Sequence, residues 1–206
     1  MGPRKSIAVI GEGITEKYYI ESLLSFTPCG FKIEPKSLGL KASNLKALEK
    51  AIVAAKDKGY DEIYCLIDMD TKLAGESKTK YLTLKKKYHD KTIIVKKADI
   101  HCTIKFIETC RCTELWFLYH FQYSTRFFLS YNEVQNELRK YLPEYEKTEK
   151  YFKSAGSLDH KMSKSGGSRY KAISNAIKSI QYKADNGNCE CSYSEMHTLL
   201  KALGID

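Results

Sequence analysis

Short apolar runs rich in β-branched residues alternate with amphipathic stretches over the first half of the chain. Such runs are typical of buried strands, and apolar residues spaced three or four apart are typical of helices. The pattern predicts strands over 5–11, 31–38, 62–68 and 92–97, and helices over 15–26, 43–58 and 80–89. Thr15 is expected to cap the first helix. Strands and helices that alternate at these spacings predict an α/β fold with a mainly parallel sheet flanked by helices.

The second half of the chain is predicted to be helical. Apolar residues recur at helical spacing over 113–121, 131–141, 144–153, 169–183 and 194–203, with Pro143 and several glycines between these stretches. We therefore predict an α/β domain over residues 1–125 and a C-terminal helical region over 126–206 that packs on it.

The composition limits the class of protein. Hydrophobic residues make up 43% of the 206 residues, which is enough for a substantial core. No apolar run reaches the length of a membrane span and no signal-peptide pattern occurs, so a cytoplasmic protein is expected. The odd number of cysteines, seven, favours reduced thiols over a disulfide framework. A zinc site formed by Cys110-x-Cys112 and Cys189-x-Cys191 is a weaker alternative, because each pair is separated by one residue instead of two.

The net charge of +9 indicates a polyanionic partner. Residues 78–97 contain eight lysines and one acid, and residues 147–183 contain nine basic residues and two acids. Tyrosines interleave both tracts, and lysines that hold phosphates beside rings that stack on bases are typical of nucleic-acid binding. The alternative is a solvated lysine-rich surface. The candidate nucleic-acid-binding residues are Lys85, Lys86, Lys87, Lys153, Lys161, Lys164, Arg169 and Lys171.

Carboxylates follow two of the predicted central strands. Glu12 and Glu16 come after the first strand, and Asp68 and Asp70 end the strand over 62–68. The carboxyl ends of parallel strands gather at one edge of an open sheet, where four acids would repel one another unless a cation neutralises them. Such oxygen ligands favour Mg²⁺ or Mn²⁺, which can activate water for phosphodiester chemistry. The alternative is that the glutamates complement a helix N-terminus and the aspartates start a turn.

A third candidate acid lies on the helix predicted over 113–121. Glu114 has apolar neighbours, among which an unpaired carboxylate is costly to bury, so we expect it to face a metal or a cation. Arg111 is the nearest candidate for a structural ion pair with it. His120 on the same helix is interpreted either as a general acid/base or phosphate contact, or as a core histidine bonded to the backbone.

Three motifs occur in order along the chain: Gly11-Glu12-Gly13-Ile14-Thr15-Glu16, then Asp68-Met69-Asp70, then Thr-Glu-Leu-Trp-Phe-Leu-Tyr-His-Phe over residues 113–121. Together they resemble the RloB-like family of Toprim-domain proteins, which is related to the OLD nucleases. By position, Glu12 and Glu16 match the first acidic motif, Asp68 and Asp70 the metal-binding pair, and Glu114 and His120 the third motif. The chain departs from the family at residues 109–113, where Thr-Cys-Arg-Cys-Thr replaces a Ser-Asn-Pro-Cys-Phe turn.

The resemblance implies a Rossmann-like Toprim domain and a nuclease of bacterial anti-phage (abortive infection) defence. We expect Mg²⁺- or Mn²⁺-dependent cleavage of RNA in preference to DNA, with transfer RNA among the substrates. An ATPase subunit or a second copy of the chain is the expected protein partner. Two other functions stay open: a non-catalytic subunit that binds nucleic acid or the ATPase, and a nucleotidyl-transfer or nucleotide-sensing Toprim protein. The expected catalytic residues are Glu12, Glu16, Asp68, Asp70, Glu114 and His120, of which Glu12, Glu16, Asp68 and Asp70 would bind the metal.

Overall fold

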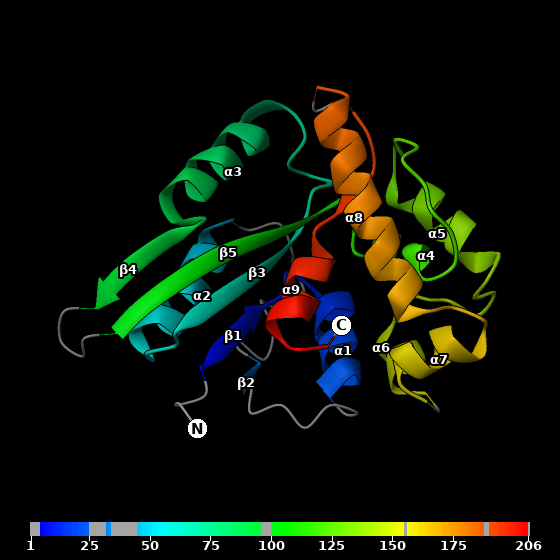
Figure 1. Cartoon of the computed structure of the whole chain (residues 1–206), viewed down its shortest axis with the longest axis horizontal. Helices are drawn as coiled ribbons and strands as arrows, with labels where there is room; N and C mark the ends of the chain where they lie inside the picture. Colours follow the sequence, from blue (N-terminus) through cyan, green and yellow to red (C-terminus); the bar gives the residue numbers. More distant parts are fainter. Residues whose placement is uncertain are drawn as a thin grey trace.

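The computed structural model describes residues 5–24, 32–33, 45–95, 100–154, 156–187 and 190–205. It shows an α/β fold built on one sheet with helices around it (Figure 1), which confirms the predicted fold class. The strands lie in the order β2-β1-β3-β5-β4, and β6 pairs with the end of β5. Their bounds are β1 Ile7–Ile10, β2 Lys32–Ile33, β3 Glu62–Asp68, β4 Lys91–Val95, β5 Ile100–Cys110 and β6 Tyr193–Ser194.

The sheet is mainly parallel, with antiparallel pairing at one side. β1 pairs in parallel with β2 and β3, and β3 with β5, whereas β4 and β6 run antiparallel to β5. The expectation that the strand over 92–97 continues the parallel sheet is therefore wrong, and β5 and β6 were not predicted. Only residues 96–99 separate β4 from β5, and a parallel crossover needs about a dozen residues. Parts of two predicted strands, 31 with 34–38 and 96–97, lie outside the described residues.

Each face of the sheet has its own core, because successive side chains of a strand point to opposite faces. Ile7 and Val9 of β1 belong to the core that is covered by α1 (Ile14–Leu24) and the C-terminal helices. Ala8 and Ile10 belong to the core that is covered by α2 (Leu45–Asp57) and α3 (Gly75–Tyr88). The C-terminal helices are α4 Glu114–Tyr119, α5 Tyr131–Arg139, α6 Glu149–Lys153, α7 Leu158–Lys164, α8 Arg169–Asp185 and α9 Met196–Ala202.

Several helix boundaries differ from the prediction. α1 begins at Ile14, so Thr15 lies in its first turn, where its hydroxyl donates to Glu114 instead of capping the helix. α6 is capped by Thr148, which leaves residues 144–148 out of the helix predicted over 144–153. α7 was not predicted. The last helix begins at Met196 because the two preceding strand residues pair with β5.

Both halves of the chain contribute to one core. Ile7 of β1 and Leu200 of α9 belong to the same cluster of buried side chains. The domain boundary proposed near residue 125 stays a prediction. None of the described helices has the length and the apolar composition that crossing a lipid bilayer requires.

Candidate active site at the carboxyl ends of the parallel strands

Three neighbouring parallel strands place the candidate acids. β1 leads through a turn that contains Glu12 into α1, whose first turn contains Glu16. β3 ends at Asp68, and β5 is followed by α4, which begins at Glu114. The carboxyl ends of parallel strands meet at one edge of a sheet. Residues as far apart in sequence as Thr15 and Glu114 are therefore hydrogen-bonded there.

One threonine hydroxyl connects two of these acids. Thr113 Oγ1 lies 2.6 Å from Glu16 Oε1 and 2.7 Å from Asp68 Oδ1, and the Thr113 backbone N–H donates to the same aspartate oxygen at 2.8 Å. A hydroxyl has a single proton to donate, so the two carboxylates cannot both accept from it. Burial, together with the negative charges of Glu16 and Glu114, raises the pKa of Asp68 well above its usual range. A shared proton or a cation is therefore needed to hold Glu16 and Asp68 this close.

Glu12 is paired with a buried lysine. The Lys72 ammonium donates to Glu12 Oε2 at 2.8 Å and to the backbone oxygen of Asp68 at 2.7 Å, and its side chain is only 2% exposed. Burial raises the pKa of Glu12 to about 7, because the opposing effect of Lys72 is incomplete and the charges of Glu16 and Asp70 add to the rise. Lys72 thus joins the turn after β1 to the end of β3.

The two carboxylate oxygens of the fully buried Glu114 have different surroundings. Oε1 accepts from the hydroxyls of Thr15 at 3.2 Å and Tyr145 at 2.9 Å, and it lies 3.3 Å from the Lys147 ammonium. Oε2 has no hydrogen-bond partner within the described part of the chain. One oxygen of a buried carboxylate is therefore left for a further ligand.

Lys147, not Arg111, is the cation beside Glu114. Burial would lower the pKa of Lys147, but the charges of Glu114, Asp68 and Glu16 raise it instead. The Arg111 guanidinium donates to the backbone oxygens of Phe128 at 2.8 Å and Asp70 at 3.3 Å. Arg111, the candidate for an ion pair with Glu114, is therefore not its partner, because these carbonyl groups hold the guanidinium.

Asp70 lies at the rim of the cluster. β3 ends at Asp68, so the strand pleat that would point both aspartates the same way does not extend to Asp70. The Asp70 side chain is exposed and accepts from the N–H of Thr71 at 2.7 Å. Its charge is still close enough to raise the pKa of Glu12.

His120 is a core residue. Its ring is buried against Trp116, and Nδ1 lies 3.1 Å from the Trp116 carbonyl oxygen, which can only accept, so Nδ1 is the donor. Burial lowers the pKa of His120 to about 4. Of the two interpretations of His120, the structure therefore agrees with the core histidine that is bonded to the backbone. Within the described residues, no hydrogen bond links its ring to the acids.

The acids are held by Thr113, Lys72 and Lys147. The described residues contain no group of three or more His, Cys, Asp or Glu side chains already arranged around an ion position. Two features nevertheless fit Mg²⁺ or Mn²⁺. All the available donors are oxygen atoms, and a cation beside Glu16 and Asp68 would supply the positive charge that this pair lacks.

The described cysteines do not form a zinc site. Five are described, all of them are buried, and no disulfide joins any of these five. Cys110 belongs to the core under α2 and α3, whereas Cys112 belongs to the core on the other face of the sheet, so these two thiols do not share a site. Cys189 lies outside the described residues.

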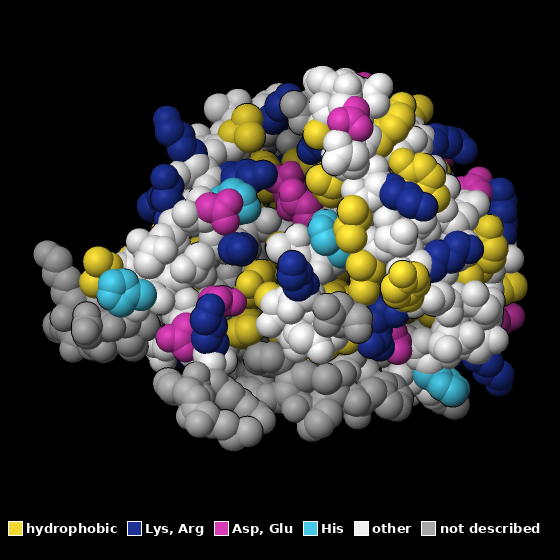
Figure 2. Space-filling model, viewed as in Figure 1, with side chains coloured by type: hydrophobic (Ala, Val, Ile, Leu, Met, Phe, Trp, Pro, Cys, Tyr) yellow, Lys and Arg dark blue, Asp and Glu magenta, His cyan; other side chains and the backbone are white. Residues whose placement is uncertain are grey.

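The eight predicted nucleic-acid-binding residues have three kinds of surroundings. Four of them are in ion pairs: Lys85 with Glu108, Lys87 with Glu49, Lys153 with Glu149 and Arg169 with Asp159. Lys86, Lys164 and Lys171 are exposed and form no ion pair within the described residues. Lys161 lines a pocket between α6 and α7. Figure 2 shows basic side chains scattered over this face, over α3 as well as over the C-terminal helices.

Four residues of the cluster were not predicted: Lys72, Thr113, Tyr145 and Lys147. The place of Thr113 directly before Glu114, in a motif already singled out, is a signal that could have identified it. Thr109, at the other end of the turn, bonds Ser194 of β6 at 2.9 Å. Nothing in the sequence indicates that Tyr145 and Lys147 reach Glu114, because their approach depends on the non-helical path of residues 144–148.

No curated protein and no solved structure matches the chain significantly. The sequence profile of the RloB-like protein family matches residues 7–203, a range that includes every acid of the cluster. This protein therefore belongs to the RloB-like family.

Proposed function

We propose that this protein is a metal-dependent nuclease with a Toprim-type site. One observation carries the proposal: acids that follow three adjacent parallel strands converge on one threonine hydroxyl and two lysines. A surplus of buried carboxylates at a sheet edge is the environment in which a divalent cation is stabilised. Membership of the RloB-like family supports the same interpretation.

The residues proposed to hold Mg²⁺ or Mn²⁺ are Glu16 and Asp68, with Glu12 and Asp70 beside them. When bound, the ion would neutralise charge on the scissile phosphate and make water a better nucleophile. Thr113 fixes Glu16 and Asp68 relative to each other through its hydroxyl.

Two lysines and Glu114 are proposed to complete the site. Glu114 has one buried oxygen without a hydrogen-bond partner in the described part of the chain, and this oxygen can accept a proton or orient a water molecule. Lys72 and Lys147 supply positive charge at the cluster, where a phosphodiester substrate brings further negative charge. Of the residues that the sequence predicts to be catalytic, His120 has the least structural support, because its ring is buried and bonded to the backbone.

RNA, including transfer RNA, is the proposed substrate, and an effector role in anti-phage defence beside an ATPase partner is the proposed context. Both follow from the family resemblance, which is a weaker argument for specificity than contacts are. The exposed ammonium groups of Lys86, Lys164 and Lys171 are available to hold a phosphate backbone.

The experiment is a cleavage assay with labelled transfer RNA and single-stranded DNA, with Mg²⁺, Mn²⁺ or EDTA. Asp68→Asn should lower the cleavage rate by about 100-fold or more, because it removes the charge that the cation needs. Asp57→Asn makes the same change at an exposed residue and should cleave like wild type. Mn²⁺ should also raise the melting temperature of wild type but not of Asp68→Asn. Wild type that cleaves no nucleic acid with either metal, even beside its ATPase partner, would overturn the proposal.

The non-catalytic binding subunit is the second candidate, and one observation favours it. Lys72 already neutralises Glu12, and Lys147 already neutralises Glu114, so part of the cluster is balanced by the protein itself. The same assay, together with an RNA-binding measurement, separates the two functions. A binding subunit binds RNA but does not cleave it with Mg²⁺ or with Mn²⁺.

A further inference from the structure

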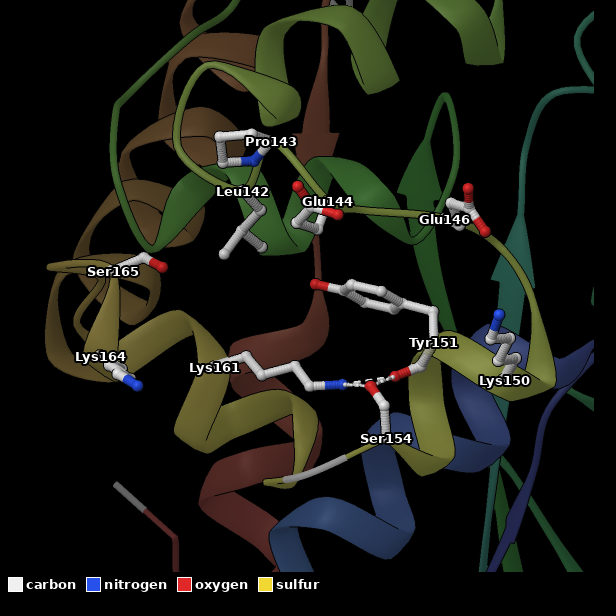
Figure 3. A pocket seen from close by; sticks show the side chains of 10 residues that line it. All are labelled: Leu142, Pro143, Glu144, Glu146, Lys150, Tyr151, Ser154, Lys161, Lys164 and Ser165. Atoms are coloured by element: carbon white, nitrogen blue, oxygen red, sulfur yellow. Dashed lines mark hydrogen bonds between the residues drawn. The ribbon is translucent and has the colours of Figure 1, made fainter.

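A pocket of about 510 Å³ opens between α6, α7 and the segment that connects α5 to α6 (Figure 3). Its volume lies within the range of sites for small ligands. The pocket is lined by charged residues of both signs around one aromatic ring, and none of these residues belongs to the carboxylate cluster. The residues that matter here are Glu144, Glu146, Lys150, Tyr151, Lys161 and Lys164.

Lys161 is a fixed cation at this pocket, and none of the described carboxylates pairs with it. Its ammonium donates to the backbone oxygen of Tyr151 and, at 2.8 Å, to Ser154 Oγ, and it lies 4.2 Å from the centroid of the Tyr151 ring. Burial lowers the pKa of Lys161, and no ion pair within the described residues opposes that effect. An ammonium has three donors and two are used, so one donor is left for an anion.

Opposite charges line this pocket without neutralising each other. Lys161 and Lys164 lie on one side of the pocket, Glu144 lies on the opposite side, and the Tyr151 hydroxyl points between them (Figure 3). Neither Glu144 nor Glu146 forms an ion pair within the described residues, although lysines line the same pocket. A matching ligand has an anionic group at one end and hydrogen-bond donors at the other.

The pocket shares its upper wall with the carboxylate cluster. Tyr145 and Lys147 reach Glu114 from the α5–α6 segment, whereas the alternate residues Glu144 and Glu146 line the pocket. The two sites are therefore separated by the thickness of one chain segment.

We propose that this pocket binds a nucleotide, with its phosphate against Lys161 and Lys164 and the N–H donors of its base toward Glu144. A phosphate suits paired ammonium groups, and a base can be recognised by aromatic and polar side chains at its edges. The inference rests on the proposed nuclease function in one respect: the nucleotide is a unit of the RNA strand that lies beside the scissile bond. A free nucleotide would use the same contacts.

The test is isothermal titration of the full-length protein in EDTA. Guanosine 5′-monophosphate is the probe, because guanine presents two adjacent N–H donors that suit a carboxylate. It should bind at least about 10-fold more tightly than guanosine or inorganic phosphate, each of which reaches one side of the pocket only. Lys164→Ala and Lys161→Met should each weaken binding about 10-fold.

Lys50→Ala is the matched control, since Lys50 is an exposed lysine on α2, and it should bind like wild type. Lys164 is exposed and makes no ion pair within the described residues, so its replacement tests binding without threatening the fold. A short guanosine-containing RNA that binds about 10-fold more tightly than the mononucleotide supports the strand as the source. Equal affinities for the short RNA and the mononucleotide support a free nucleotide as the ligand of this pocket.

The inference is overturned if neither guanosine 5′-monophosphate nor the short RNA binds to wild type. It is also overturned if Lys164→Ala and Lys161→Met both bind these two probes like wild type. That failure is distinct from failure of the nuclease proposal, because the titration needs no metal and no cleavage. Nucleotide binding retained by Asp68→Asn, together with no cleavage by wild type, would overturn the nuclease and support the pocket.

Discussion

Two acids near the carboxyl ends of adjacent strands, the buried Glu108 and the half-buried Asp68, have opposite electrostatic surroundings. Glu108 of β5 accepts from the Tyr81 and Tyr193 hydroxyls and pairs with Lys85. Burial acts to raise the pKa of Glu108, but these three partners together hold it below its usual range. Asp68 of β3, on the other face of the sheet, has a pKa raised well above its usual range by burial and neighbouring carboxylates.

The difference shows which of the two acids already has its charge balanced. Glu108 has a cation and two hydroxyl donors for one charge, so its contacts stabilise the fold and leave little for a ligand. Asp68 shares one hydroxyl with Glu16, and one oxygen of the nearby Glu114 has no hydrogen-bond partner among the residues that the structure describes. Burial alone does not mark a functional acid. A functional acid is indicated instead by an excess of carboxylate charge over the hydrogen-bond donors and cations that surround it.

The largest expected difference is between the activities of variants at these two positions. Asp68→Asn should lose about 100-fold or more of the cleavage rate, with a free energy of unfolding equal to or above that of wild type, because it removes charge repulsion. Cleavage rate and urea unfolding measured on the same preparation check this. Lower stability with normal cleavage would contradict it.

Glu108→Gln should have the reverse effect. Its replacement leaves Lys85 and two buried hydroxyls without their acceptor charge, and the free energy of unfolding should fall by about 2 kcal/mol. The cleavage rate per folded molecule should stay at the wild-type value. Glu76→Gln, at an exposed glutamate on α3, is the control and should change neither quantity.

Thr113→Val tests the shared hydroxyl with a side chain of the same shape. We expect about a 10-fold lower cleavage rate, because Glu16 and Asp68 lose the group that fixes them relative to each other. The backbone N–H of Thr113 still donates to Asp68 in this variant. Thr83→Val on α3 is the matched control, and equal rates for the two variants would show that the hydroxyl has no role.

The smallest effect, counted per pH unit, concerns the pH dependence of stability. The pKa of Glu12 is raised by burial from 4.5 to about 7, so between these values the folded protein keeps a proton that the unfolded chain has released. The stabilisation is complete below the unfolded pKa and is lost as pH rises through about 7, by at most about 1.4 kcal/mol per pH unit. Urea unfolding between pH 5 and 8 should show a flatter slope for Glu12→Gln. An unchanged slope would contradict the assignment.

The sequence predicted the parts of the fold that depend on local patterns. β1 and β3 are uninterrupted apolar runs, and the acids that follow them are visible as motifs. β5 was missed although its apolar residues alternate, because His101, Thr103 and Lys105 make it resemble a surface segment. Its central place, between β3 and β4, depends on long-range pairing.

The acids of the candidate site were also predictable from local motifs, whereas the cations that balance them were not. Glu12, Glu16, Asp68 and Glu114 come together as the motifs indicate. The charges that balance them were not predictable, because Lys72 comes from the turn after β3 and Lys147 from a segment that was expected to be helical. These contacts exist only once the tertiary structure has formed.

The segment from 144 to 148 has a thermodynamic consequence. Its alternate residues contact the carboxylate cluster on one side and line the α6–α7 pocket on the other. A ligand that moves this segment from either side changes the free energy of occupancy on both sides, and by linkage the two effects are equal. If Mn²⁺ tightens nucleotide binding by some factor, the nucleotide must tighten Mn²⁺ binding by the same factor.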